Sequence, residues 1–144
     1  MQIDDILQQK GVDVITATPE MLITKVAQIM SEYRIGLLVV CGESGKVIGV
    51  ISERDIVRGV AEYPDHTTTM IVSDLATMDV AVCTPEDHPE TVLKRMCEMG
   101  IRHMPVVQYN KLKGLISNRD LFRFLLEESE ASGKALKYND FSFL

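Results

Sequence analysis

Two short segments combine a hydroxyl and a carboxylate at a spacing that suits the binding of a sugar phosphate. Residues 49–55 read GVISERD and residues 114–120 read GLISNRD. In both, an apolar strand sequence ends at Ser and a helical sequence follows. The start of a helix offers free backbone N–H groups and the positive end of the helix dipole, which attract anions. Ser52 and Ser117 add a hydroxyl that can donate to a phosphate.

The carboxylates Asp55 and Asp120 follow these serines by about one helical turn and are expected on the same side of the helix. A carboxylate accepts hydrogen bonds well from the paired hydroxyls of a ribose. The candidate cations for the phosphate are Arg54, Arg119, Arg102 and His103. A Ser cap with an acid in the first turn also stabilises a helix on its own. A purely structural role therefore stays open.

Both segments belong to one unit that is written twice. At a constant offset the two copies share identical residues, among them Thr18-Pro19-Glu20 with Thr84-Pro85-Glu86, Val26 with Val92, Met30 with Met96, and Ile35 with Ile101. The offset changes by one residue only where residues 42–45 oppose residues 108–110. Turn residues there make a change of length harmless. An internal repeat of this kind predicts two copies of one structural unit.

Each copy predicts the element order β-α-β-β-α. A short β-rich piece precedes Thr-Pro-Glu, where Thr18 or Thr84 is expected to cap a helix with Pro at its first position. That helix is amphipathic, and its apolar stripe is Leu22, Val26, Ile29 and Met30 in the first copy, and Val92, Leu93 and Met96 in the second. A hairpin and a final Ser-capped helix complete the copy. A copy of about 50 residues is small for independent folding, so the two are expected to pack together.

The sequence thus predicts an α+β fold of two repeats packed sheet to sheet with pseudo-two-fold symmetry. The predicted division is an N-terminal helix at 1–11, a first repeat at 12–62, a linker at 63–79, a second repeat at 80–128 and a tail at 129–144. Ile3, Ile6 and Leu7 have helical spacing in the first of these segments. Whether the apolar end of the tail, with Phe141 and Phe143, is disordered or docks on a partner stays open.

These motifs resemble those of tandem CBS-domain proteins. The resemblance rests on the doubled G-h-h-S-x-R-D segments, the doubled Thr-Pro-Glu, and residues 101–107, IRHMPVV, which look like the "IRHLPVV" strand of that family. It covers about residues 12–126. It implies one module with two clefts that bind AMP, ADP, ATP or a related adenosine ligand, and a homodimer of modules.

The resemblance also implies a role for each candidate site residue. Asp55 or Asp120 would hold the ribose, and Ser52 or Ser117 the phosphate. Arg102 and His103 would face the phosphates, with Arg54 and Arg119 nearby. The backbone near Thr16, Leu37, Val82 and Met104 would frame the adenine, and Pro105 is a further candidate ligand-binding residue.

The two clefts are expected to differ. Thr16 would give the Asp120 cleft a polar neighbour for the base, whereas the matching Val82 offers no side-chain hydrogen bond. Glu53 in the first copy, where the second has Asn118, places an extra carboxylate that repels a phosphate. Both differences favour the Asp120 cleft.

Composition narrows the function further. A net charge of −6 with scattered Lys and Arg disfavours nucleic acid as a partner. Three cysteines without a C-x-x-C pair and no apolar stretch of membrane-spanning length predict a cytoplasmic protein without disulfides. No nucleophile elbow, Walker loop or HExxH motif is present, and the histidines have no metal-ligand spacing, so neither catalysis nor a metal site is expected.

The resulting hypothesis is a regulatory module that binds an adenine nucleotide, AMP first among them, requires no cofactor and reports occupancy to a regulated protein that the sequence does not identify. An interaction scaffold without a nucleotide is the alternative. A redox-responsive regulator that uses Cys41 or Cys97, and a weak enzyme, are further ones.

Overall fold

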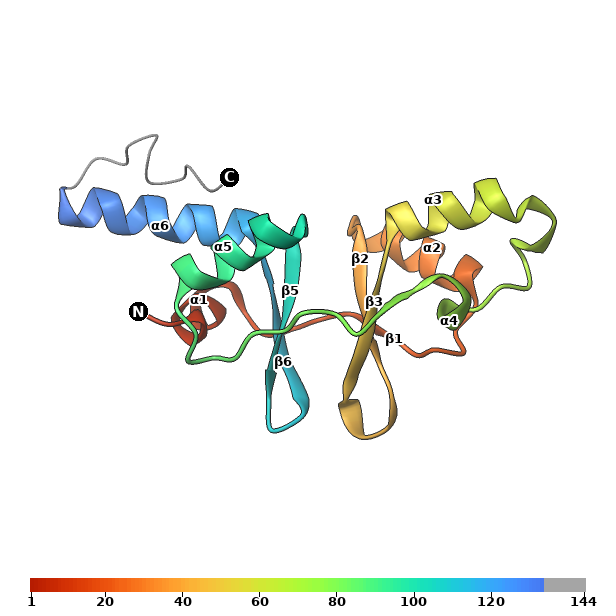
Figure 1. The fold of residues 1–144 in the computed structure, drawn as a ribbon, viewed down its shortest axis with the longest axis horizontal. Coiled ribbons are helices and arrows are strands. Elements are labelled where there is room, and N and C mark those ends of the chain that lie inside the picture. The colour runs from red at the N-terminus through yellow and green to blue at the C-terminus, as the bar shows by residue number, and fades with distance from the viewer. Residues whose placement is uncertain (134–144) are drawn as a thin grey trace. The chain divides into compact units, whose positions relative to one another are not determined.

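The computed structural model describes residues 1–133, which form a mixed α+β fold (Figure 1). The elements in chain order are α1 (Ile3–Lys10), β1 (Thr16–Ala17), α2 (Ile23–Tyr33), β2 (Leu37–Cys41), η1 (Glu43–Gly45), β3 (Val47–Ser52), α3 (Glu53–Glu62), η2 (Pro64–His66), α4 (Val72–Leu75), β4 (Thr77–Met78), α5 (Pro89–Met99), β5 (His103–Gln108), β6 (Lys111–Ser117) and α6 (Asn118–Ser132). The tail residues Phe141 and Phe143 lie outside the described part of the chain.

The chain separates into two compact units, which are named here by their aspartates. The Asp55 unit comprises Val14–Val80 with Tyr109–Leu112. The Asp120 unit comprises Met1–Asp13, Ala81–Gln108 and the described residues from Lys113 onward. The units do not coincide with the two repeats, because the N-terminal helix packs with the second repeat.

The Asp55 unit is built on a four-stranded sheet in the order β1-β2-β3-β4. β1 runs parallel to β2, while β3 is antiparallel to both of its neighbours. The range predicted as a linker supplies α4 and β4, and Val72 and Leu75 of α4 are buried in the core of this unit. Apolar residues in that range therefore contribute to the fold.

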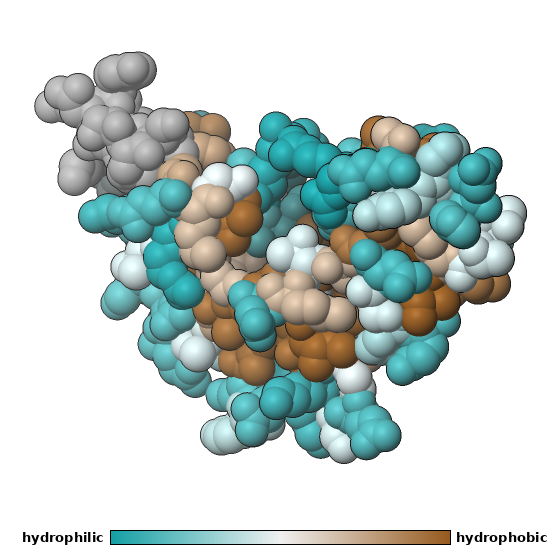
Figure 2. Space-filling view, turned by 45° about the vertical axis from the view of Figure 1, so that its right-hand side comes forward, coloured by the Kyte–Doolittle hydropathy of each residue, from teal (hydrophilic) through white to brown (hydrophobic). Residues whose placement is uncertain are grey.

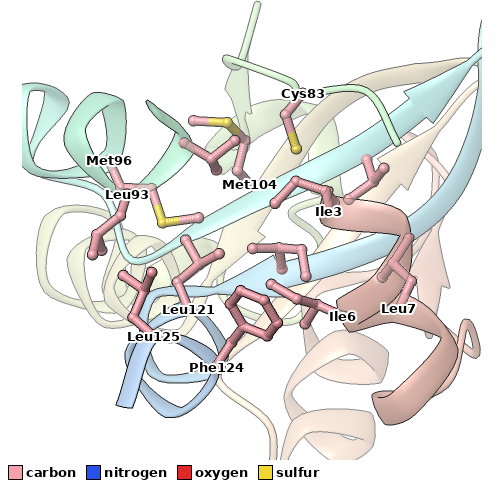
Figure 3. Packing of buried hydrophobic residues seen from close by; sticks show 13 residues of the cluster. Ile3, Ile6, Leu7, Cys83, Leu93, Met96, Met104, Leu121, Phe124 and Leu125 are labelled. Atoms are coloured by element: carbon pink, nitrogen blue, oxygen red, sulfur yellow. The ribbon is translucent and has the colours of Figure 1, made fainter. Parts of the chain in front are cut away.

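The Asp120 unit contains the antiparallel β5–β6 pair and the helices α1, α5 and α6. Cys83 forms a parallel bridge to Val106, the counterpart of the β1–β2 pairing. The predicted N-terminal helix is confirmed. Its Ile3, Ile6 and Leu7 lie in one buried cluster with residues of α5 and α6 (Figure 3).

The predicted helix starts at Thr-Pro-Glu are wrong. Thr18 and Thr84 open turns, in which Met21 N donates to Thr18 O (3.2 Å) and Asp87 N donates to Thr84 O (3.2 Å). Proline is well suited to the second position of such a turn, which competes with the first turn of a helix. α2 begins only at Ile23, and α5 has Pro89 at its start.

The position of Leu22 changes as a consequence of this shift. Leu22 was predicted within the apolar stripe, but it is the N-cap of α2 and the residue is 46% exposed. The rest of that stripe is confirmed, because Val26 and Met30 are buried in the core of the Asp55 unit.

Among the described residues, no helix is both long and apolar enough to cross a membrane.

Candidate ligand sites at Asp55 and Asp120

The two Ser-Asp pairs occupy the strand-to-helix turns, as predicted. Ser52 ends β3 and caps α3, and its Oγ accepts a hydrogen bond from Asp55 N (3.2 Å). Ser117 ends β6 and caps α6 in the same way, with Asp120 N as the donor (3.1 Å). Each Asp carboxylate in turn accepts from the backbone N–H of its Ser at 2.9 Å. The result is a reciprocal capping arrangement in both units.

The carboxylate of Asp55 has both oxygens engaged by its own repeat. Oδ2 accepts from the N–H and the Oγ of Ser52, the latter at 3.0 Å. Oδ1 accepts from Nη2 of Arg58 at 3.0 Å, one turn along α3. The side chain of Asp55 is 8% exposed. A ribose would therefore have to displace an existing partner.

The carboxylate of Asp120 is more open and has a different cation. Oδ2 accepts from Ser117 N and from Nζ of Lys10, the latter at 2.5 Å. Within residues 1–133, no hydrogen bond to Oδ1 is found, and the side chain is 15% exposed. One carboxylate oxygen of Asp120 is thus available to a donor from outside.

The loop before each hairpin lies against the start of the last helix. In the Asp55 unit, Glu53 N donates to Gly36 O, and a Cβ at Gly36 would lie 3.1 Å from Cδ of Glu53. In the Asp120 unit, Asn118 N donates to Arg102 O at the matching place. The Asp55 unit thus has the acidic side chain of Glu53 at this turn, whereas the Asp120 unit has the basic residue Arg102 in the matching loop.

Several groups set the protonation of the Asp120 region. Burial alone would raise the pKa of Asp120, but hydrogen bonds from Lys10 and Ser117 outweigh it and lower that pKa below its ordinary value. The pKa of His103 is also lowered, first by burial and then by the positive charges of Lys10 and Arg102, against the opposing effect of Asp120. At neutral pH the site therefore holds an ionised carboxylate, an uncharged imidazole and cations.

The remaining predicted residues are placed as follows. In the Asp120 unit, Arg102 and Arg119 are exposed, while the side chains of Met104 and Pro105 are buried. The carbonyl of Pro105 accepts from Cys83 N (3.0 Å), and that of Val82 accepts from Arg95 (3.2 Å). In the Asp55 unit, Thr16 and Arg54 are exposed and Leu37 is partly buried. That Thr16 and Asp120 line one cleft stays a prediction.

The cysteines have little thiolate character. Burial raises the pKa of Cys83 to about 12 and also raises the pKa values of Cys41 and Cys97. Since the thiolate is the reactive form, these pKa values argue against redox sensing at neutral pH. No group of three or more potential metal ligands occurs within residues 1–133.

Two contributors to the sites were missed by the sequence reasoning. Arg58, matched by Arg123 in the second repeat, has helical spacing to Asp55, so its pairing with the acid was foreseeable. Lys10 had no comparable signal, because its partner lies 110 residues away in the sequence.

Comparison with known proteins agrees with this architecture. The model of the CBS domain family matches residues 3–62 and 72–127, so the chain belongs to the CBS-domain proteins. It contains a pair of such domains.

Individual relatives extend the comparison. An uncharacterised 17.7 kDa protein of Acidianus ambivalens is 36% identical over 110 residues, which cover 76% of this chain and 65% of that protein. The chain spans 40–65% of the length of the first four curated relatives that it matches.

Solved structures show the same fold. The CBS-domain protein ATU1752 of Agrobacterium tumefaciens has a TM-score of 0.80 and 30% identity, covering 87% of this chain and 99% of that one. The CBS domain pair of the protein MJ0100, solved in complex with 5′-methylthioadenosine and S-adenosyl-L-methionine, has a TM-score of 0.76 and 25% identity, covering 87% of this chain and 99% of that one.

Proposed function

We propose that this CBS pair is a regulatory module that binds an adenosine ligand through Asp120 and reports its occupancy to a partner protein. The observation that carries the proposal is Oδ1 of Asp120, to which no hydrogen bond is found among residues 1–133. Asp120 lies in the first turn of α6, which Ser117 caps. A ribose diol can donate to this oxygen while a phosphate approaches the helix N-terminus. AMP is the first candidate, and ADP and ATP follow.

The proposal is supported by the ligand chemistry of a similar protein. The pair of MJ0100 was solved with two adenosine derivatives, methylthioadenosine and S-adenosylmethionine. These two ligands and AMP share adenine and a ribose with a free diol. We infer that a carboxylate such as Asp120 binds the ribose diol that these ligands share.

Regulation would follow from linkage. A ligand that prefers one arrangement of the chain shifts the population towards it by the difference in binding free energy. No step of this mechanism needs a catalytic residue. The homodimer remains part of the proposal. Hydrophobic residues reach the surface in the view of Figure 2, which supports a homodimer. Exposed large hydrophobic side chains on helices include Tyr33, Val57 and Leu126.

Calorimetric titration tests the proposal. The protein is first unfolded and refolded to release co-purified ligand, and is then titrated with AMP, ADP, ATP, NADH and S-adenosylmethionine. We expect at least one to bind, with the first site filled in each chain being the Asp120 site. Failure of all five to bind would overturn the proposal and leave the interaction scaffold.

The scaffold is the second candidate because both oxygens of Asp55 are already bonded within the protein. At Asp55 the Ser-Asp pair can serve as a helix cap alone. Under this alternative, neither aspartate affects ligand binding, and substitution of either one changes only stability.

A further inference from the structure

The N-terminal helix brings a lysine to the Asp120 carboxylate. Nζ of Lys10 donates to Leu115 O at 2.8 Å and to Oδ2 of Asp120. The ammonium and the backbone N–H of Ser117 share that oxygen, so the charge lies close to the start of α6. The Lys10 side chain is 36% exposed and thus reachable from solvent.

The position of Lys10 is fixed by the core of the unit. Ile3, Ile6 and Leu7 of α1 are buried against α6 and its neighbours (Figure 3). Burying side chains of this size contributes about 1.5–3 kcal/mol each. Leu7 lies so close to β6 that a Cβ on Gly114 would come within 2.7 Å of its Cδ2. Lys10 follows in the last turn of the helix, so its backbone cannot easily leave the site.

The Asp55 unit has no counterpart to Lys10. Its own short helix α4 (Val72–Leu75) is four residues long, against eight in α1, and contains no basic residue. The segment that follows it, β4, is also uncharged. The cation on Asp55 is instead Arg58 of the same helix. It binds Oδ1, the oxygen for which Asp120 has no partner among residues 1–133. Lys10 is therefore a specific feature of the Asp120 site.

Among residues 1–133, the ammonium of Lys10 has two hydrogen-bond acceptors, which leaves one donor unused there. Of the three N–H donors of a lysine, one is used on Leu115 O and one on Asp120. A third can reach an anionic oxygen of a ligand. The same ammonium offsets the negative charge of Asp120, which would otherwise repel a phosphate bound at the start of α6.

We propose that Lys10 is a ligand-binding residue that makes the Asp120 site prefer adenosine ligands with a negatively charged 5′ group over neutral ones. The inference rests on the function proposed above and adds to it the residue that distinguishes anionic from neutral ligands. Oδ1 of Asp120 accepts hydrogen bonds from the ribose, which both classes of ligand share. Lys10 interacts with the negatively charged 5′ group, which only one class has.

The test compares AMP with adenosine on the full chain by calorimetry. In the wild type, AMP binds more tightly than adenosine. In Lys10→Met, the affinity for AMP falls about tenfold, or about 1.4 kcal/mol, while that for adenosine changes less than about twofold. Lys10→Arg keeps the preference for AMP within about threefold. Lys94→Met is the matched control, because it removes one exposed charge from α5 of the same unit, and it leaves the preference unchanged.

The outcomes separate the two proposals. If the wild type binds neither AMP nor adenosine, nor any of the other four ligands in the titration series, the proposed function itself fails. If it binds one of those four but not AMP, the present inference is overturned and the proposed function stands. If the wild type binds both AMP and adenosine and Lys10→Met weakens both equally, Lys10 only supports the structure and the present inference is overturned. Tighter binding of both ligands by Lys10→Met would also overturn it, because Lys10 would then be a competitor for the carboxylate. Thermal unfolding of each variant confirms that the titrated protein is folded.

Discussion

The Asp55 and Asp120 units carry the same Ser-Asp pair on the same turn, yet they surround it differently. The second carboxylate oxygen of Asp55 is occupied by Arg58, and Glu53 lies against Gly36 in the neighbouring loop. Asp120 has one oxygen without a partner in the described part of the chain, a lysine from the N-terminal helix, and Arg102 in the matching loop. The repeat thus duplicates the backbone frame of a site. The residues around the Ser-Asp pair, which differ between the repeats, decide whether that site suits an anionic ligand.

The largest expected effect separates the two aspartates. We expect Asp120→Ala to weaken AMP binding about 30- to 100-fold, because hydrogen bonds to a charged acceptor contribute about 1.5–3 kcal/mol. The matched Asp55→Ala should change the affinity less than about threefold. Calorimetry measures both, and urea unfolding confirms that each variant loses only the 0.5–2 kcal/mol or so expected of a cap. A larger loss of affinity in Asp55→Ala would reverse the comparison.

The second prediction concerns the glycines that precede the two serines. A Cβ on Gly49 would meet the backbone carbonyl of Thr77 at 2.5 Å, whereas a Cβ on Gly114 would meet the end of the Leu7 side chain. Overpacking costs about 1–3 kcal/mol, and a side chain can move aside more easily than a strand. We therefore expect Gly49→Ala to lose about 2–3 kcal/mol of unfolding free energy and Gly114→Ala about 1 kcal/mol, measured in urea.

These two variants also differ in their effect on binding. Gly114→Ala displaces Leu7 and with it the helix that carries Lys10, so it should reduce the preference for AMP over adenosine. Gly49→Ala should leave that preference intact. Equal stability losses in the two variants would mean that α1 holds Gly114 as tightly as β4 holds Gly49.

Local sequence signals predicted most of the fold. The repeat, the hairpins and the Ser caps were confirmed, because each depends on residues a few positions apart. The helix start predicted at Thr-Pro-Glu was wrong because Pro suits both a turn and a helix start. In the first repeat the turn is formed, and Pro19 O accepts a hydrogen bond from Ser73 N. That acceptor is used by a residue far along the chain, which local reasoning cannot anticipate.

The site was predictable only in part, for the same reason. Ser117 and Asp120 follow from one capping pattern, and Arg102 was predicted only as a candidate cation for a phosphate. Lys10 lies in a segment that reads as an ordinary amphipathic helix. Its pairing depends on which unit α1 packs against, and this is decided by tertiary packing of Ile3, Ile6 and Leu7.

The third prediction removes the charge that distinguishes the Asp55 unit. Glu53 lies against Gly36, where the other unit has Arg102. Glu53→Gln should raise the affinity of the Asp55 site for AMP about threefold to tenfold, because like charges a few ångströms apart repel even in water. Calorimetric stoichiometry would then rise towards two per chain. The control Glu32→Gln on α2 carries the same change of net charge and should have no effect; an equal rise there would refute the local explanation.

The smallest expected effect is on pH dependence. His103 has a lowered pKa in the folded chain, chiefly through burial and then through Lys10 and Arg102, and the matching residue Leu37 does not titrate. Below the ordinary His value of 6.5 the unfolded chain therefore binds a proton more readily than the folded one, and stability falls as the pH falls. Between pH 7.5 and 5.5 we expect a loss of less than about 1 kcal/mol, as for a partly solvated group.

Urea unfolding of His103→Leu, which copies the first repeat, should remove this part of the slope. His66→Gln, at an exposed position in η2, should keep it. Because the pKa of Asp120 is lowered, its own contribution is present at neutral pH and lost only as the pH falls below its ordinary value of 3.8, outside this window. If the unfolding free energy of His103→Leu kept the same dependence on pH, that dependence would come from neither His103 nor Asp120. The predicted difference between the two units in mild acid would then be wrong.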